Sequence, residues 1–364
     1  MKYSTIIEKL EKEWASLPKE PDPLYTRSSL SIDFAGMANA ESMDKLKRRG
    51  GEIGYFDVIT NGKEIYFANK TNSIEAYNVD DEIDYNFITK DLSSYIAFAK
   101  INAGKILFVK ALEGQSIKAR LMIGGYVQII ISAEKGSDVA VEEVAYGKEV
   151  GAINEINAHE NSKVKLDILQ ESRKMLSFYS GVAGKGSSIV VNSLFANGDV
   201  KSSNSILCHE GSKAYINNVV LAYRGNVDVA DYIVNLKANG EAFIVAKAIG
   251  KDSTILIKEN SRIEKDASES KADIVAKGLN MGNSKIEVIP AMTANENNIK
   301  ASHSAGVAPL SKEAVEYLMS RGIRITNAKK LMLKGFVSEN ANAFSAKEIA
   351  DSFIEIALSR ILGE

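Results

Sequence analysis

The feature that most constrains this chain is a 25-residue repeat in its middle. Turn pairs recur at that spacing, and the residues three, five and eight positions after each turn are apolar. The turn pairs are Gly136-Ser137, Asn161-Ser162, Gly186-Ser187 and Gly211-Ser212. The apolar residues are Val139, Val164, Ile189 and Ala214, then Val141, Leu166, Val191 and Ile216, then Val144, Leu169, Leu194 and Val219. A period of this length with strand-like patterning predicts a solenoid built from β-strands.

A right-handed parallel β-helix fits this repeat best. Propeller blades need ~40 residues, and leucine-rich repeats would show regular Leu and Asn positions that are absent here. Positions three and five share one face of a strand, and position eight implies a bend or bulge before the inward face resumes. The same offsets apply from Gly240 and from Asn283. The repeat predicts about seven or eight coils of ~25 residues, with both ends needing caps.

The regions on either side of the repeat differ from it, so the fold is predicted to be mainly β with three parts. Residues 1–104 form an N-terminal helical and mixed α/β unit, 105–300 form the parallel β-helix core, and 301–364 form a C-terminal helical domain. In the first part we expect helices over 1–17 and 91–103, and strands over 64–68 and 73–77. Three prolines, at 18, 21 and 23, follow the first helix and are typical of a linker.

The β pattern ends near 290–292, and helices are expected from there to the end of the chain. Ser311 is the predicted N-cap of a helix over 312–321, and Thr326 of a second helix to about 337. A capping box at 345–348 opens the third helix, whose apolar face is expected both to pack and to dock a partner.

Composition narrows the class of protein. The 364 residues are 45% hydrophobic and 25% charged with a formal net charge of −2, which is typical of a globular protein and argues against a nucleic-acid binder. We expect no leader peptide, and no segment reaches the ~18 apolar residues of a membrane span. The single cysteine, Cys208, excludes an intrachain disulfide framework and favours a reducing cytoplasm.

The stretch between the β region and the helices carries a family resemblance. It reads Ser302-His303-Ser304-Ala305, then Ser311-Lys-Glu-Ala, then Tyr317-Leu-Met-Ser-Arg-Gly-Ile323. This stretch resembles the C-terminal motif of the SufB/SufD family of iron–sulfur cluster assembly proteins. The resemblance implies a non-catalytic scaffold without a permanently bound cofactor, whose members pair with one another and hold a transient cluster at their interface. It also implies a SufC-like ABC-type ATPase bound through the C-terminal helices.

Within that family the resemblance favours a SufD-like member. SufB members carry Glu directly after the motif histidine and a cysteine in the final coils. Here Ser304 follows the histidine and residues 265–300 contain no cysteine. The mid-core cysteine of SufB falls near Ser205 rather than Cys208. Whether the chain pairs with a SufB-type subunit or with itself stays open.

The resemblance makes His303 the candidate metal ligand for an interface cluster. The alternative is a junction residue that is hydrogen-bonded to backbone. For Cys208 a buried core residue is favoured, and a reactive thiol is the alternative. Strand alternation sends Cys208 and Glu210 to one face and His209 to the other, so these three residues are not expected to share a metal. His159 is expected at an exposed corner.

The remaining motifs do not point to catalysis. The many Lys and Glu residues of 255–275 are interpreted as the solvated outer face of the last coils. The glycine-rich runs at 124–125 and 181–186 lack the Gly-Lys-Ser that a phosphate-binding loop needs. Two other functions remain open, namely a β-helix enzyme acting on polysaccharide and a structural solenoid that assembles through its ends.

Overall fold

The protein is described by a computed structural model that covers residues 3–13, 30–69, 72–83, 93–196 and 198–364. The helices are α1 (Tyr3–Glu13), α2 (Met43–Ile53), α3 (Ser94–Asn102), α4 (Lys312–Ser320), α5 (Ile325–Ala341) and α6 (Lys347–Leu362), with a short 3-10 helix η3 (Gly36–Asn39). The strands are β1 (Val58–Thr60), β2 (Ile65–Phe67), β3 (Ile74–Asn78), β4 (Lys105–Ala111), β5 (Ser116–Ile123), β6 (Tyr126–Ala133), β7 (Asp138–Ala158), β8 (Lys163–Ala183), β9 (Ser188–Ala196), β10 (Asp199–Cys208), β11 (Lys213–Tyr223), β12 (Asn226–Asn235), β13 (Glu241–Lys251), β14 (Thr254–Ile263), β15 (Lys271–Met281), β16 (Lys285–Ala294) and β17 (Lys300–Pro309).

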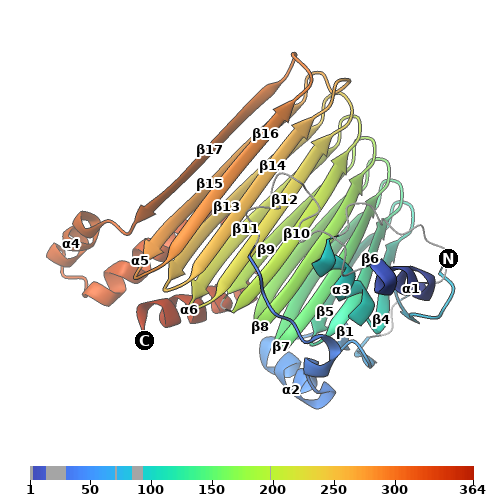
Figure 1. The fold of residues 1–364 in the computed structure, drawn as a ribbon, viewed down its shortest axis with the longest axis horizontal. Helices are drawn as coiled ribbons and strands as arrows, with labels where there is room; N and C mark the ends of the chain where they lie inside the picture. Colours follow the sequence, from blue (N-terminus) through green and yellow to red (C-terminus); the bar gives the residue numbers. More distant parts are fainter. Residues whose placement is uncertain (1–2, 14–29, 70–71, 84–92, 197) are drawn as a thin grey trace.

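The predicted parallel β-helix is confirmed, with about eight turns (Figure 1). One sheet contains β5, β9, β11, β13, β15 and β17 with the first halves of β7 and β8. The other contains β4, β6, β10, β12, β14 and β16 with their second halves. The 25-residue register pairs Asp138 with Lys163, Lys163 with Ser188 and Ser188 with Lys213.

The later coils are longer than the repeat predicts. Lys213 pairs with Glu241, so the turn equivalent to Gly211 is Asn239 rather than Gly240. Asn239 has a φ of 61°, the left-handed conformation that Asn tolerates better than most residues. The offsets counted from Gly240 are therefore wrong by one residue, because the chain adds residues both at the corner between β11 and β12 and at the corner before β13.

The apolar side chains divide into two cores, and this division corrects one prediction. Positions three and five of the repeat, such as Val139 and Val141, point into the β-helix. The side chain at position eight does not point into the β-helix. Val144 and its counterparts Leu169, Leu194 and Val219 face outward and are buried beneath helices, among them α6. β7 and β8 therefore need no bulge, since each continues as a strand through position eight.

The β region also extends further than predicted. β16 continues through Ala294, and β17 adds one more strand beside β15. The predicted end of the β pattern near 290–292 is therefore wrong, and His303 lies within a strand rather than in a junction loop. The polar residues at 295–298 form only the turn between these two strands.

The N-terminal unit closes the first coil and covers one side of the β-helix. β1 pairs with β5, and β3 pairs with β4. The predicted strands over 64–68 and 73–77 correspond to β2 and β3, and the helix over 91–103 to α3. On α3, the Nζ atom of Lys100 lies 2.9 Å from Oε1 of Glu155 on β7, with both side chains buried. The end of the predicted helix 1–17 and the proline segment lie outside the described residues.

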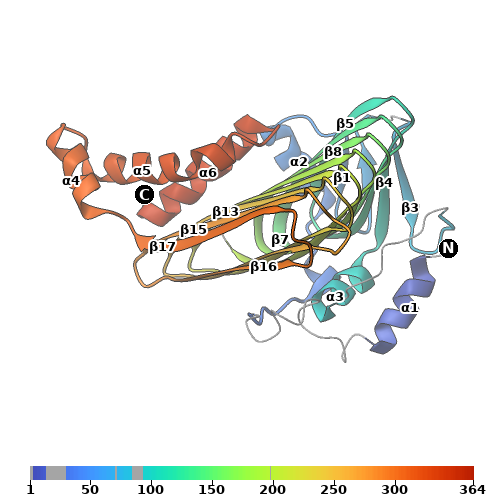
Figure 2. The same ribbon diagram turned by 90° about the horizontal axis from the view of Figure 1, so that it is seen from above.

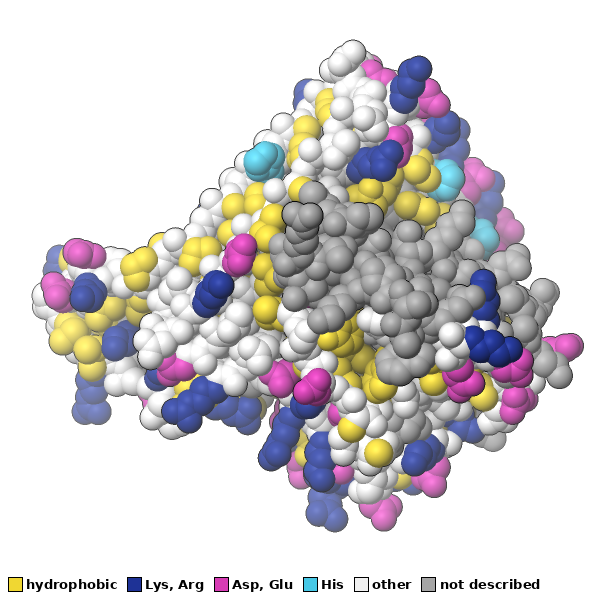
Figure 3. All heavy atoms as spheres, in the orientation of Figure 1, with side chains coloured by type: hydrophobic (Ala, Val, Ile, Leu, Met, Phe, Trp, Pro, Cys, Tyr) yellow, Lys and Arg dark blue, Asp and Glu magenta, His cyan; other side chains and the backbone are white. Residues whose placement is uncertain are grey.

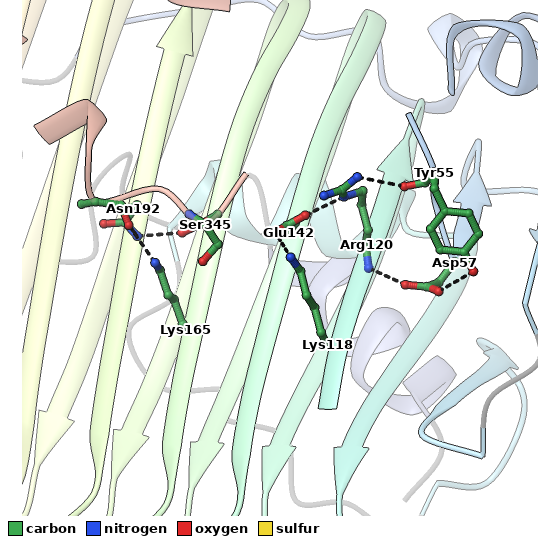
Figure 4. A network of polar contacts seen from close by, with 10 residues as sticks. Tyr55, Asp57, Lys118, Arg120, Glu142, Lys165, Asn192 and Ser345 are labelled. Atoms are coloured by element: carbon green, nitrogen blue, oxygen red, sulfur yellow. Dashed lines mark hydrogen bonds and ion pairs between the residues drawn. The ribbon is translucent and has the colours of Figure 1, made fainter. Parts of the chain in front are cut away.

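The helices α4, α5 and α6 lie on the opposite side of the β-helix from α1 and α3 (Figure 2). The loop before α6 is fastened to the outer face of the first sheet (Figure 4). Lys165 Nζ donates to the carbonyl of Ala343 over 2.7 Å, and the backbone N–H of Ser345 donates to Asp167 Oδ2 over 2.5 Å. The predicted cap Ser311 is confirmed, because its Oγ accepts from Ala314 N.

The other two predicted caps of this unit are wrong. α5 already begins at Ile325, before Thr326, and the N-cap of α6 is Ala346. Ser345 does not form a capping box, because its backbone N–H is used in holding the loop to Asp167.

Candidate functional site

The C-terminal end of the β-helix is its most exposed part. Every residue of β17 is exposed, whereas no residue of β4, the first coil strand of the other sheet, is exposed. β16, the last strand of the other sheet, is half-buried over most of its length. Among the described strands, β17 pairs with β15 alone, so its outer edge presents backbone N–H and C=O groups to solvent.

The register places His303 on the inner face of this last strand. His303 lies beside Ile274 of β15, which is buried inside the β-helix, and neighbouring residues in parallel strands point to the same side. Ala301, Ala305 and Val307 share that inner face. They are exposed because no described coil covers them. The imidazole of His303 is thus an exposed inward-facing group at the open end of a solenoid.

The outer face of β17 carries small side chains. Ser302, Ser304 and Ala308 alternate with the inward residues, and Ser302 Oγ is hydrogen-bonded to Asp273 Oδ1 on β15. A regular strand with short side chains on both faces can accept a further strand along its free edge. The end of the β-helix is therefore suited to pairing with another chain.

Cys208 and His303 are not brought together. Cys208 ends β10, which is separated from the end strand β16 by β12 and β14. At a strand spacing of ~4.8 Å this places the thiol roughly 14 Å below the open end. Burial raises the pKa of Cys208 to about 12, so the thiol is a protonated core residue at neutral pH. The favoured interpretation as a core residue agrees with this environment.

The other two histidines are exposed at corners of the solenoid. His159 follows β7, and its Nε2 lies 3.9 Å from Glu134 Oε2. His209 and Glu210 are both exposed in the turn after Cys208, so the predicted alternation, which placed Glu210 on the face of Cys208, is wrong there. Among residues that the structure describes, no three His, Cys, Asp or Glu side chains gather in a way that could hold a metal ion. A cluster at His303 would need ligands from a second chain.

The sequence analysis missed a row of polar side chains along the inside of the β-helix. Asn154, Tyr179, Asn204, Asp231 and Glu259 are register neighbours on β7, β8, β10, β12 and β14. All five are buried. The alternation Ile255, Ile257, Glu259 was the available signal, since it places the glutamate on the face of two apolar residues.

These buried carboxyl groups have perturbed acidity. Burial raises the pKa of Asp231, and burial together with the charge of Asp231 raises the pKa of Glu259. Burial also raises the pKa of Glu143, which faces Asn154, to about 7. The interpretation of residues 255–275 as a solvated face is therefore wrong for β14. Glu259 points inward, and Lys258 is buried on the outer face beside Asp228.

The C-terminal helices present a second candidate surface. The apolar face of α6 is buried against the first sheet, with Phe353 and Leu358 in that core, so it cannot also dock a partner as expected. Besides Ile356 on α6, exposed apolar residues lie on α4 and α5, and Figure 3 shows hydrophobic side chains at the surface over α4. They are Tyr317, Met319, Ile325 and Leu331. No helix among the described residues is long and apolar enough to cross a membrane.

Comparison with known proteins agrees with this architecture. Residues 118–336 match the family model described as SUF system FeS cluster assembly, SufBD core domain. A SufBD family iron–sulfur cluster assembly protein of Archaeoglobus fulgidus is 24% identical over 81% of this chain and 86% of its own length. Iron–sulfur cluster assembly protein SufB of Bacillus subtilis is 30% identical over 36% of this chain and 29% of its own length.

Proposed function

This chain belongs to the SufBD family of the SUF system for iron–sulfur cluster assembly, and we propose that it is a SufD-like, non-catalytic scaffold subunit. Its open end would pair with a SufB-type subunit or with a second copy. The observation that carries this proposal is the exposed strand β17, which combines a free edge with His303 on its inner face. Ser304 in place of the Glu of SufB supports the SufD-like assignment.

The pairing proposal rests on the unprotected edge of β17. An exposed regular edge strand is normally protected by charges, bulges or a cover, because it can pair with other chains. β17 carries one charged residue, Lys300 at its start, and ends at Pro309. A second solenoid placed against β16 and β17 would cover both end strands and bury Val307.

The coordination proposal concerns His303. A neutral imidazole is a suitable ligand for iron, and thiolate or carboxylate ligands from the paired subunit would complete the set. The cluster is cargo that is built and handed on, so the chain needs only one ligand at the shared surface.

The helices α4 and α5 are the proposed docking surface for an ABC-type ATPase. Only Leu310 and Ser311 separate the end of β17 from the start of α4. A force applied to α4 by ATP-driven closure of the partner would therefore reach the strand that carries His303. This short connection would couple ATP hydrolysis by the partner to the strand that carries the proposed cluster ligand.

Anaerobic reconstitution with iron and sulfide tests the cluster role. The chain is mixed with a SufB-type partner, and visible absorption of the cluster is recorded for wild type, His303→Ala and His209→Ala. We expect loss of absorption only in His303→Ala, since His209 is exposed but lies at a corner away from the open end. Equal absorption in all three mixtures would reject His303 as a ligand.

Co-purification with the ATPase tests the docking surface separately. Leu331→Glu on α5 is compared with Leu112→Glu, because the two leucines are 55% and 54% exposed and Leu112 lies between β4 and β5. We expect ATPase binding to weaken at least tenfold in the first variant only. Binding that survives Leu331→Glu unchanged would place the ATPase elsewhere.

A further inference from the structure

The inside of the β-helix contains a carboxylate that is surrounded by hydrogen-bond donors. Asp231 Oδ1 accepts from Tyr179 Oη at 3.1 Å and from Asn204 Nδ2 at 2.7 Å. Its Oδ2 accepts from Asn218 Nδ2, which approaches from β11 in the opposite sheet. Three donors on one carboxylate favour its ionised form. Burial nevertheless outweighs these donors and raises the pKa of Asp231, so an ionised Asp231 in the apolar core needs a further positive partner.

A second carboxyl group lies beside it, and the polar side chains that act on it are those of Asp231 and Asn218. Glu259 is the register neighbour of Asp231 on the next strand, β14, and is fully buried. Neither Oε1 nor Oε2 of Glu259 has a hydrogen-bond partner, and Oδ1 of Asn218 also lacks one. Buried polar atoms are almost always satisfied, and a bound cation would satisfy three such acceptors on adjoining side chains.

The described part of the chain supplies no such charge. The neighbouring residue Lys258 points to the outside of the sheet, where its Nζ lies 2.7 Å from Asp228 Oδ1. Within the described ranges, no Lys, Arg or His forms an ion pair with Asp231 or Glu259. The other lumen carboxyl, Glu143, contacts Asn154 in an earlier coil. Two stacked carboxylates thus lie in a low-dielectric interior without a protein counter-ion.

We propose that Asp231 and Glu259, together with the Asn218 amide oxygen, form a binding site for a hard divalent cation inside the β-helix. Carboxylate and amide oxygens are the ligands preferred by Mg²⁺, Mn²⁺ and, among the softer ions, Fe²⁺. One divalent ion neutralises the two carboxylates. Tyr179 and Asn204 would orient Asp231 from behind, as hydrogen-bonded partners of a metal ligand do.

The position of the site gives it access to one end of the molecule. Glu259 is covered on its C-terminal side by β16, where Pro290 is its register neighbour and is only half-buried. The cation site therefore lies one strand from the open end that carries His303. The inference concerns the single chain, so it does not depend on pairing or on the ATPase.

Metal content per chain tests this site. Wild type, Glu259→Gln, Asp231→Asn and Glu143→Gln are incubated with MnCl₂, desalted and analysed for bound manganese by mass spectrometry. Glu143→Gln is the matched control, because it also removes a fully buried lumen carboxyl. We expect about one tightly bound Mn²⁺ in wild type and in the control, and at least tenfold weaker binding in Glu259→Gln and Asp231→Asn.

Because the variants can differ in stability from wild type, the thermal unfolding temperature of each variant is also measured with and without Mn²⁺. Each variant is its own reference, and only wild type and Glu143→Gln should gain stability on adding the ion. No bound manganese in wild type would overturn the proposal, and so would equal binding in wild type and Glu259→Gln. In either case the two carboxyl groups share a proton instead.

Discussion

The two ends of the β-helix are built from the same kind of coil but are finished differently. At the N-terminal end, β1 and β3 pair with β5 and β4, and no residue of β4 is exposed. At the C-terminal end, β17 is exposed along its whole length. Both ends are made of regular strands, so the difference lies in what covers them. The chain covers its first coil itself and leaves its last coil exposed, which is the basis of the proposed pairing.

This difference separates residues that hold the fold from residues that are free for the proposed pairing. Leu107 on β4 and Val307 on β17 are both apolar and face the interior side of their strands. Leu107 is fully buried, whereas Val307 is 36% exposed. Position in the repeat is therefore not enough to assign a role, because the same inward position is core at one end and surface at the other.

Alanine substitution at the two ends should give the largest contrast in stability. Leu107→Ala should lower the free energy of unfolding by about 2–5 kcal/mol, because it leaves a cavity in the closed core. Val307→Ala should change it by no more than about 0.5 kcal/mol. Chemical denaturation of the single chain measures both. Equal losses at the two positions would mean that the open end is as well packed as the closed one.

The pH dependence of stability should come partly from the closed end. Glu143, in a coil near the N-terminal end, has its pKa raised from an ordinary 4.5 to about 7 by burial. Between these values the unfolded chain loses a proton that the folded chain keeps. Stability should therefore fall as the pH rises from about 4.5 to about 7, by roughly 3 kcal/mol in total, and then level off.

Glu143→Gln should remove this contribution, because Gln has no proton to lose. Denaturation midpoints between pH 4 and pH 8 should then show a shallower slope in the variant than in wild type. A slope of the same size in both proteins would assign the pH dependence to other carboxyl groups. Asp231 and Glu259 are the first candidates, because burial raises their pKa values in the same direction.

Much of the β-helix could be predicted from the sequence, because one period governs the early coils. Val139 and Val164 are register neighbours as the offsets required. The period could not show that Val144 belongs to a second core, since a strand residue buried under a helix has the same composition as one inside the solenoid. It also failed once the corners on either side of β12 lengthened, because insertions at a turn shift the count without changing the strands.

The candidate site was found only in part. The motif around His303 singled out the residue, but its inward direction and the free edge follow from the pairing of β17 with β15, which sequence spacing did not reveal. Glu259 was missed for a different reason. Its neighbours in the sequence are charged, so composition indicated a solvated face, whereas the two-residue alternation indicated the interior.

The central claim is that the open end is the pairing surface. Sedimentation velocity tests it directly, with the chain alone and mixed with a SufB-type subunit. The variants are Val307→Asp and the control Leu112→Asp, which places the same charge on an exposed residue at the other end. Wild type and Leu112→Asp should form the paired species, and Val307→Asp should remain single because an unpaired charge would be buried. Pairing of Val307→Asp as strong as that of wild type would contradict the account.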